Sequence, residues 1–353
     1  MNRSFLSSSH TSLSHAALAV ASPAIVNLRS LAPGMVETIN HPAMPDVASL
    51  RHGSQAESWC LVERGKLGAI CSLWLDAVPR PDGAGLKEKC AALGHFFAQD
   101  AEAGGTLLGF ACARLRMLGA QYVVGPLDGG TWHRYRLVTQ AGERPPFFLE
   151  YYTPCDWPEL FVEAGFSPVA TYRSAQTATA NYADRSAEKF AGRAVQMALT
   201  VRTFQPEETA ATLAALYDLS VQSFAHNVFY TPITRQEFEG IYRPLLPYLV
   251  PDLFLLAEHN GQLVGFVLAI PDYGQRTRGE AIDTIVIKTL ARHPARSYAG
   301  LGSYLAQEIH QRAAALGYRT AIHALMHDSN ASRIISDKSA QTIRCYALYG
   351  REL

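Results

Sequence analysis

Two segments of the chain, offset by 196 to 198 residues, repeat one pattern of apolar runs and turns. Residues 59–75 and 253–270 each hold two apolar runs joined by a turn, which is Arg64-Gly65 in the first and Asn260-Gly261 in the second. This arrangement predicts a β-hairpin in each segment. A fixed offset between similar segments indicates duplicated architecture, so the chain is expected to contain two copies of one structural unit.

Each copy continues with a strand, an amphipathic helix and a further strand. Apolar residues recur at helical spacing up to Gly119 in the first copy and Gly317 in the second, and both glycines are expected to end their helices in the left-handed conformation. The apolar runs at 122–124 and 320–325 are expected to return beside the preceding strand. The predicted fold class is α/β (α+β), with two tandem units, each a mixed central β-sheet flanked by helices.

Other parts of the chain give simpler predictions. Residues 172–198 are expected to form a strand followed by a polar connection. Further helices are predicted at residues 157–164, 206–224, 234–242 and 330–338.

The length of 353 residues favours more than one domain. Residues 1–52 are rich in Ser, Ala and Pro and have no acidic residue before Glu37, so they are expected to form a flexible tail. A signal peptide is the alternative for this segment, although only Arg3 is basic at its start. The two units are then expected at 53–198 and 199–353.

The bulk composition excludes several classes of partner. Lys and Arg total 31, as do Asp and Glu, so no net field favours nucleic acid, and no apolar run is long enough to predict a membrane span. The six cysteines show no C-x-x-C spacing, which favours a reducing, cytoplasmic location and no metal site. The oligomeric state is open between a monomer and a homodimer.

Residues 284–317 form the segment that most indicates function. A β-rich run leads through a loop containing Gly300 and Gly302 into the second amphipathic helix. Glycines let the backbone approach a ligand closely, and the free amides of a helix's first turn bind anions. The segment therefore predicts an anion site that suits a pyrophosphate, with glycines that serve packing alone as the alternative.

With these features the chain resembles the GNAT acyltransferase superfamily, and specifically members with two tandem units. The resemblance is good over residues 202–353 and weak over residues 58–180. In that family the sheet splits between two parallel strands, and acyl-CoA lies in the split with its pyrophosphate on the glycine loop. The usual loop is Arg or Gln, two residues, Gly, one residue, then Gly or Ala; here Ser297 takes the basic or amide position, with Arg296 just before it.

The resemblance implies acetyl-CoA, or another acyl-CoA, as cofactor. Backbone groups near Leu290 and Arg292 would pair with the pantetheine arm, and side chains of Arg292 and Arg296 would add positive charge. Asn330 and Ser332 would lie near the thiol, although capping of a helix explains them equally. The amides expected to hold the pyrophosphate are those of Tyr298, Ala299, Gly300, Leu301, Gly302 and Ser303.

Many relatives place a tyrosine about seven residues after that Asn as the general acid, but Asp337 stands there in this chain. Tyr346 is the predicted replacement, because a phenol can protonate a thiolate. Tyr349, three residues later on a strand, should face the opposite side. His323 and Asp283 are the competing candidates for the general base.

The acceptor pocket is expected between the helices that precede the second unit's hairpin. Lys288, in the cofactor strand, is expected to contact a carboxylate on the acceptor, since an unpaired buried ammonium is costly. Ordinary aromatic packing is the alternative for the rest of the predicted substrate contacts, which are Phe224, His226, Asn227, Phe229 and Tyr230.

The first unit is expected to be degenerate. Asp100 and Glu102 lie at the start of its helix and would repel a pyrophosphate. Residues 124–137 are left with two equal interpretations, either a wall of the substrate cleft or a brace between the units.

The predicted activity is transfer of an acyl group from acyl-CoA to an amine of a small molecule or peptide, without nucleic acid or membrane. Two alternatives remain: a catalytically silent acyl-CoA sensor or scaffold, and a transferase that uses aminoacyl-tRNA.

Overall fold

A computed structural model of the protein describes residues 23–31, 39–50, 54–81, 89–329 and 340–353. Its strands form one mixed sheet of 13 strands in the order β1-β2-β3-β4-β5-β13-β7-β12-β11-β10-β9-β8, with β6 paired to β13. The strands are β1 (Ala24–Asn27), β2 (Glu57–Glu63), β3 (Lys66–Pro79), β4 (Lys89–Ala98), β5 (Tyr122–Gly125), β6 (Leu137–Gln140), β7 (Ser167–Ala178), β8 (Thr200–Thr203), β9 (Phe254–His259), β10 (Gln262–Pro271), β11 (Thr284–Arg292), β12 (Thr320–His327) and β13 (Gln341–Glu352). The helices are α1 (Val47–Leu50), α2 (Ala101–Met117), α3 (Trp157–Glu163), α4 (Arg185–Gln196), α5 (Thr209–Ser223), α6 (Arg235–Tyr242), α7 (Tyr273–Thr277) and α8 (Leu301–Ala315).

The duplicated pattern is confirmed. The predicted hairpins are β2–β3 and β9–β10, and each is followed by a strand, a long helix and a parallel strand, namely β4-α2-β5 and β11-α8-β12. Gly119 and Gly317 follow the two helices with φ of +92° and +90°. The predicted left-handed helix ends are therefore confirmed.

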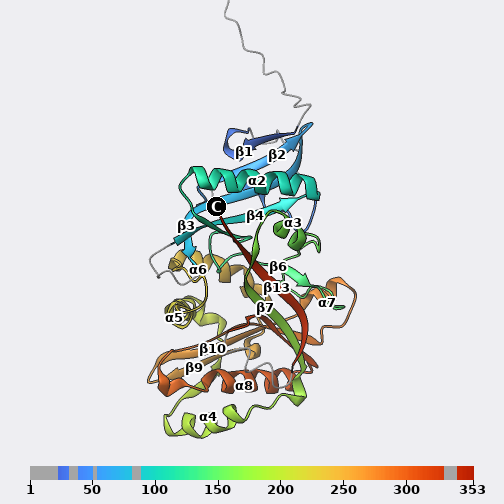
Figure 1. The fold of residues 1–353 in the computed structure, drawn as a ribbon. Coiled ribbons are helices and arrows are strands. Elements are labelled where there is room, and N and C mark those ends of the chain that lie inside the picture. Colours follow the sequence, from blue (N-terminus) through green and yellow to red (C-terminus); the bar gives the residue numbers. More distant parts are fainter. Residues whose placement is uncertain (1–22, 32–38, 51–53, 82–88, 330–339) are drawn as a thin grey trace, which may run out of the picture.

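Two long strands join the units, because each pairs with strands of the other unit. β13, at the end of the chain, pairs with β5 of the first unit, and β7, at the end of the first unit, pairs with β12 of the second. β7 and β13 also pair with each other, so both run through the middle of the molecule (Figure 1). The boundary predicted near residue 198 therefore does not separate two sheets, because each unit is completed by a strand from the other half of the sequence.

Two further predictions differ from the structure. Part of the expected tail is ordered: β1 pairs with β2, and Leu28, Ala43 and Leu50 are buried in the first unit's core, because their apolar side chains cover that core. The expected polar connection contains helix α4, whose Phe190 and Ala194 pack into the second unit's core. Residues 1–22, 32–38 and 51–52 of the predicted tail lie outside the described residues.

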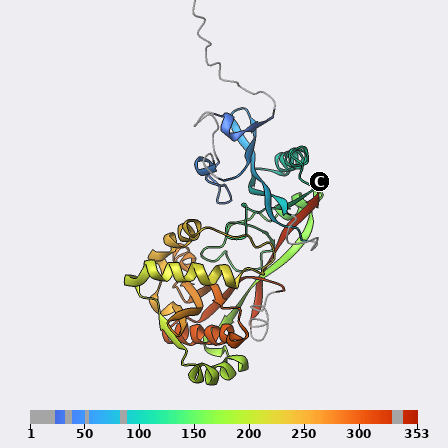
Figure 2. The same ribbon diagram turned by 90° about the vertical axis from the view of Figure 1, so that its left-hand side faces the viewer.

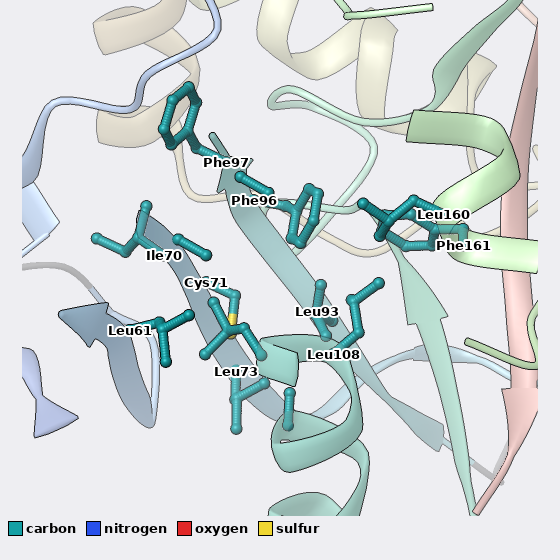
Figure 3. Close-up of a cluster of buried hydrophobic side chains, with 14 of the residues drawn as sticks. Leu61, Ile70, Cys71, Leu73, Leu93, Phe96, Phe97, Leu108, Leu160 and Phe161 are labelled. Carbon is teal, nitrogen blue, oxygen red and sulfur yellow. The ribbon is translucent and has the colours of Figure 1, made fainter. Parts of the chain in front are cut away.

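The cores explain how the helices sit on the sheet. In the first unit, α2 and α3 cover one face, where Leu108 lies beside Leu93 and the ring of Phe161 lies 5.1 Å from that of Phe96 (Figure 3). In the second unit, α8 and α4 cover one face of β10 through Val267, and α5 and α6 cover the other through Phe266. Figure 2 shows α5, in yellow, apart from α8 and α4 at the bottom. Among the described residues, no helix has the length and apolar character needed to cross a membrane.

Candidate active site

The parallel strands β11 and β12 separate in the middle of the second unit. Their pairing runs from Thr284 opposite Thr320 to Ile287 opposite His323 and stops there. Both strands are irregular at this point, because Lys288 is an extra residue in β11 relative to β10 and β12 shifts register against β7 between His323 and Met326. Such bulges bend a strand and interrupt its pairing. The result is a split in the sheet, which we call the split below.

The glycine loop opens α8 with an uncapped N-terminus. Gly300 is the N-cap residue with φ of +98°, it offers no capping side chain, and no acidic residue lies in the first turn. The first amides of a helix have no intrahelical acceptor, so they remain available to an anion. The amides of Tyr298 and Ala299 instead donate to Ala295 and Arg296 carbonyls, at 3.0 Å each. Of the amides predicted to bind the anion, only those of residues 300–303 therefore remain available.

Arg193 of α4 adds a positive charge that the sequence did not predict. It is exposed, it donates to the carbonyl of Ala299, and its guanidinium lies over the ring of Phe190 at 4.9 Å. The spacing of Phe190 and Ala194 was the available signal for a helix here. Of the predicted loop side chains, Arg296 is exposed, whereas Tyr298 is tied by a 2.8 Å contact between its hydroxyl and His259 Nδ1.

The predicted pantetheine contacts lie on β11 beyond the split. Leu290 is half-buried on the α8 side. The amide of Arg292 donates to Ser223 Oγ at 3.3 Å, so the last residue of α5 reaches this edge of β11. A ligand that pairs with the Arg292 amide would replace this serine contact.

Lys288 lies at the split itself and is half-buried. Its ammonium is 5.9 Å from the ring centroid of Tyr242, on the side of the sheet that α5 and α6 cover. Burial lowers the pKa of Lys288, and repulsion from Arg136 lowers it further. Among the described residues, no hydrogen bond or ion pair involves the Lys288 ammonium.

His323 lies under α8 instead of in the split. Its Nε2 is 2.9 Å from Nε2 of His310 on α8, and Tyr182 stacks on His310 at 4.0 Å. Burial lowers the pKa of His323 to about 4. The side chain points to the α8 face because the period-2 alternation of β12 puts His323 on the same face as Ala321. The structure therefore does not support His323 as the base.

Asp283 is also far from the split. It precedes β11, about 16 Å along the strand from Lys288 at 3.3 Å per residue. Its carboxylate accepts from Gln275 at 2.9 Å and Thr284 at 3.0 Å, and the hydrogen bond from Gln275 lowers the pKa of Asp283. These contacts hold the turn between α7 and β11, and the role of Asp283 as base stays a prediction.

Tyr346 is buried, with 3% of its surface exposed. Its hydroxyl donates to the carboxylate of Glu150 and lies 3.0 Å from Ser174 Oγ. Burial and the Glu150 charge raise the pKa of Tyr346, which weakens it as an acid. Tyr349 packs in the other core cluster, as predicted from their spacing. The acid role of Tyr346 stays a prediction.

The predicted acceptor segment divides into three groups. Phe229 is buried beside Tyr172 and Tyr346, while His226 and Asn227 are exposed. Phe224 and Tyr230 meet Trp132 of the first unit, with ring centroids 5.9 and 6.1 Å away. Trp132 also donates to the Thr231 carbonyl at 3.0 Å. Its loop thus braces the two units, which favours the second interpretation of residues 124–137. Asn330 and Ser332 lie outside the described residues.

In the first unit, the groups that correspond to the ligand-binding groups of the second unit are bonded to other residues of the protein. β4 and β5 pair only at two positions, Ala91 with Val123 and Ala92 with Val124. Beyond them, the amide of Leu127 donates to the Leu93 carbonyl at 2.8 Å. The N-terminus of α2 is capped by Asp100, which accepts from the Ala103 amide at 2.9 Å. Both observations support the expectation that this unit does not bind CoA.

Comparisons with known proteins point to one family. Residues 214–334 match the model of the acetyltransferase (GNAT) family. No curated protein matches the chain.

Solved structures share the fold. One is the glucosamine N-acetyltransferase region of a fungal multi-domain β-N-acetylglucosaminidase, at 13% identity and TM-score 0.52, covering 94% of this chain and 38% of that one. A probable N-acyltransferase of Enterococcus faecalis has 9% identity and TM-score 0.51, covering 87% and 64%. A tandem GNAT protein from the clavulanic acid biosynthesis pathway has 11% identity and TM-score 0.49, covering 94% and 98%. The family match supports acyltransferase activity in general terms, and the likeness to the solved structures with TM-scores of 0.52 and 0.51 shows the fold alone.

Proposed function

We propose that the protein transfers an acyl group, acetyl foremost, from acyl-CoA to an amine of a small molecule or peptide, because residues 214–334 match the model of the acetyltransferase (GNAT) family. The single observation that carries this proposal is the uncapped N-terminus of α8 at the end of the split. An anionic diphosphate suits these amides, because they lack both a capping side chain and a nearby carboxylate.

Three parts of the chain would cooperate. The amides of residues 300–303, with Arg193 beside them, hold the diphosphate. The unpaired edge of β11 beyond Ile287 accepts the pantetheine arm as an added strand would. The backbone amides at the Lys288 bulge lie where the sheet opens, and they can stabilise the negative charge that develops when an amine attacks a thioester.

CoA supplies a thiolate leaving group whose departure requires a proton from water or from a side chain. Tyr346 is the side-chain candidate, but its proton is held by Glu150. This observation keeps a second candidate function open, namely an acyl-CoA sensor without turnover.

The donor site is tested by isothermal titration calorimetry with acetyl-CoA. Arg193→Ala is expected to weaken binding about tenfold through the lost charge–phosphate contact. The matched control is Lys189→Ala, which removes an equal charge from the exposed side of the same helix one turn earlier. Equal affinities of both variants and the wild type would contradict the proposed diphosphate site.

Turnover is tested by incubating the full chain with acetyl-CoA and a library of amines, followed by mass spectrometry. Free CoA together with an acetylated amine is the expected result. Tight binding of acetyl-CoA without any acetylated product would favour the sensor.

A further inference from the structure

β12 is bent where it borders the split, because two of its residues lie opposite one residue of β7. The register of β12 against β7 shifts between His323 and Met326. Ala324 and Leu325 both lie opposite Ser174 as a result. Leu325 has a φ of +58°, in the left-handed region that residues with a side chain rarely adopt. This segment is a β-bulge, and it begins directly after the last residue of β12 that pairs with β11.

The bulge changes the face of the sheet on which Leu325 lies. In a regular strand Leu325 would share the α8 face with His323, because side chains two residues apart point the same way. Instead, Leu325 packs against the buried clusters that contain Ile322 and Phe229. Ile322 lies on the face opposite His323. The bulge therefore brings an apolar side chain of β12 to the side of the split where the predicted acceptor segment lies.

Ser174 supplies the hydrogen bond that this bulge requires. The hydroxyl oxygen of Ser174, which is fully buried, accepts from the Leu325 amide at 3.0 Å. A buried amide without an acceptor is costly, so this contact stabilises the backbone where the ladder between β12 and β7 is interrupted. Ser174 is therefore the residue of β7 that holds the bulge.

Two further groups fix the direction of the Ser174 hydroxyl. Ser174 Oγ lies 3.0 Å from the Tyr346 hydroxyl, and the Tyr346 hydroxyl donates to the Glu150 carboxylate. Each hydroxyl has one proton to donate. Since Tyr346 donates to Glu150, Ser174 donates to Tyr346 and keeps a lone pair for the Leu325 amide. We call Ser174, Tyr346 and Glu150 the clamp below.

The clamp connects the split to the first unit. Ser174 is on β7, Tyr346 is on β13, and Glu150 lies in the loop between β6 and α3. Glu150 is itself held by the buried ion pair with Arg344. The bulge that borders the split in the second unit is thus fixed by a strand and a loop that come from the first half of the sequence.

We propose that Ser174 is a positioning residue of the donor site, which fixes the bulge of β12 through the clamp and so keeps the split open for the pantetheine arm of acyl-CoA. The proposal rests on the transferase function. It gives the first unit, which is not expected to bind CoA itself, a part in binding the acyl donor. In this role Tyr346 acts through Ser174 and does not transfer its proton.

The binding test compares acetyl-CoA with phosphoadenosine diphosphate, the nucleotide part of CoA without pantetheine, by calorimetry on the full chain. Ser174→Ala is expected to weaken binding of acetyl-CoA about fivefold through the lost hydrogen bond and to leave binding of the nucleotide unchanged. The matched control is Ser58→Ala. Ser58 is also a buried serine, on β2 of the first unit, with its Oγ 2.7 Å from Ser72 Oγ. This variant is expected to bind both ligands as the wild type does.

Hydrogen exchange tests the clamp without any ligand. The amides of β12 beyond His323 are expected to exchange faster in Ser174→Ala and in Tyr346→Phe than in the wild type, but not in Ser58→Ala. Unchanged exchange in Ser174→Ala would overturn the proposal, because the serine would then not hold the bulge.

Kinetics with an amine found in the library separate positioning from proton transfer at Tyr346. Positioning predicts that Tyr346→Phe raises KM for acetyl-CoA and leaves the pH dependence of kcat unchanged. A lower kcat with an altered pH profile and an unchanged KM would identify Tyr346 as the acid and would remove it from the clamp.

The binding results also separate this proposal from the transferase itself. If Ser174→Ala and the wild type bind acetyl-CoA equally well, the positioning role is overturned and the transferase stands. If Ser174→Ala loses affinity for acetyl-CoA and for the nucleotide to the same degree, the cause is a general loss of stability, and the positioning role is again overturned. If the wild type does not bind acetyl-CoA, the transferase fails and the positioning role fails with it.

Discussion

Gly300 shows at the scale of one residue how backbone geometry and a binding site depend on each other. Its φ of +98° lies where a side chain is strained, and its missing side chain leaves the first amides of α8 uncapped. A Cβ at this position would meet Phe190 Cβ at 3.4 Å. The loop thus requires glycine for its conformation, whereas the space beside α4 would accept a Cβ at ordinary contact distance.

Gly300→Ala is therefore expected to cost about 1 kcal/mol of stability and to weaken acetyl-CoA binding severalfold. Gly317→Ala is the matched control at the opposite end of α8, with φ of +90° and no atom within 4 Å of the added Cβ. Both should lower the melting temperature, but only the first should change affinity measured by calorimetry. A loss of affinity in both would show that helix stability, and not the loop, controls binding.

The buried pair His310 and His323 makes stability depend on pH. Burial lowers the pKa of His310 to about 3 and that of His323 to about 4, so both are neutral when folded. The unfolded chain has ordinary histidines with a pKa near 6.5 and takes up their protons first as the pH falls. Stability due to this pair is complete above about pH 6.5 and is lost as the pH falls toward 4.

Urea unfolding at pH 7 and pH 5 should show a drop of about 2 kcal/mol for each of the two histidines. The variant His310→Leu is expected to show roughly half the drop of the wild type, since one titrating group remains. If the variant and the wild type lose the same stability between these pH values, other groups determine the acid sensitivity.

At the scale of elements, β13 is held to a loop of the first unit by a buried ion pair. Arg344 of β13 pairs with Glu150, and the two side chains are 5% and 2% exposed. Arg344 also donates to the carbonyls of Ala141 and Arg144, and Glu150 accepts from Tyr346. The loop of the first unit is thereby tied to the last strand of the chain.

Removing one partner of this pair should be costly. Glu150→Ala is expected to lose roughly 3 kcal/mol in denaturant unfolding, because it leaves an uncompensated buried guanidinium. The double variant Glu150→Leu with Arg344→Met should recover part of that loss. If the double variant is less stable than Glu150→Ala, the ion pair stabilises the fold more than the apolar side chains that replace it.

At the scale of the whole molecule, the two units cannot be separated by cutting the chain once. β13 completes the first unit and β7 completes the second, while their mutual pairing links the two halves of one sheet. If either unit unfolded, a strand edge of the other unit's part of the sheet would lose its hydrogen-bonding partner.

Differential scanning calorimetry of the full chain should therefore give one cooperative transition, with equal calorimetric and van 't Hoff enthalpies. Two resolved transitions would show that the shared strands do not couple the units. Adding acetyl-CoA should raise the single transition temperature, because binding to one unit stabilises both.

Local patterns in the sequence were sufficient to predict much of this molecule. The hairpins at Arg64-Gly65 and Asn260-Gly261, the helix ends at Gly119 and Gly317 and the loop into α8 all depend on neighbouring residues, so short-range rules apply to them. The duplicated order of elements followed from a comparison of the chain with itself. Helix α4 was missed because its apolar stripe is short and lies in a polar segment.

The tertiary structure alone decided which side chains share a site. The direction of Lys288 depends on a bulge that no local pattern marks, and the exchange of β7 and β13 brings together residues far apart in sequence, such as Ser174 and Tyr346. The same fold put His323 under α8, with its Nε2 2.9 Å from that of His310. Strand alternation has a period of two, so one inserted residue reverses the face of those that follow, and sequence spacing alone could not assign these roles.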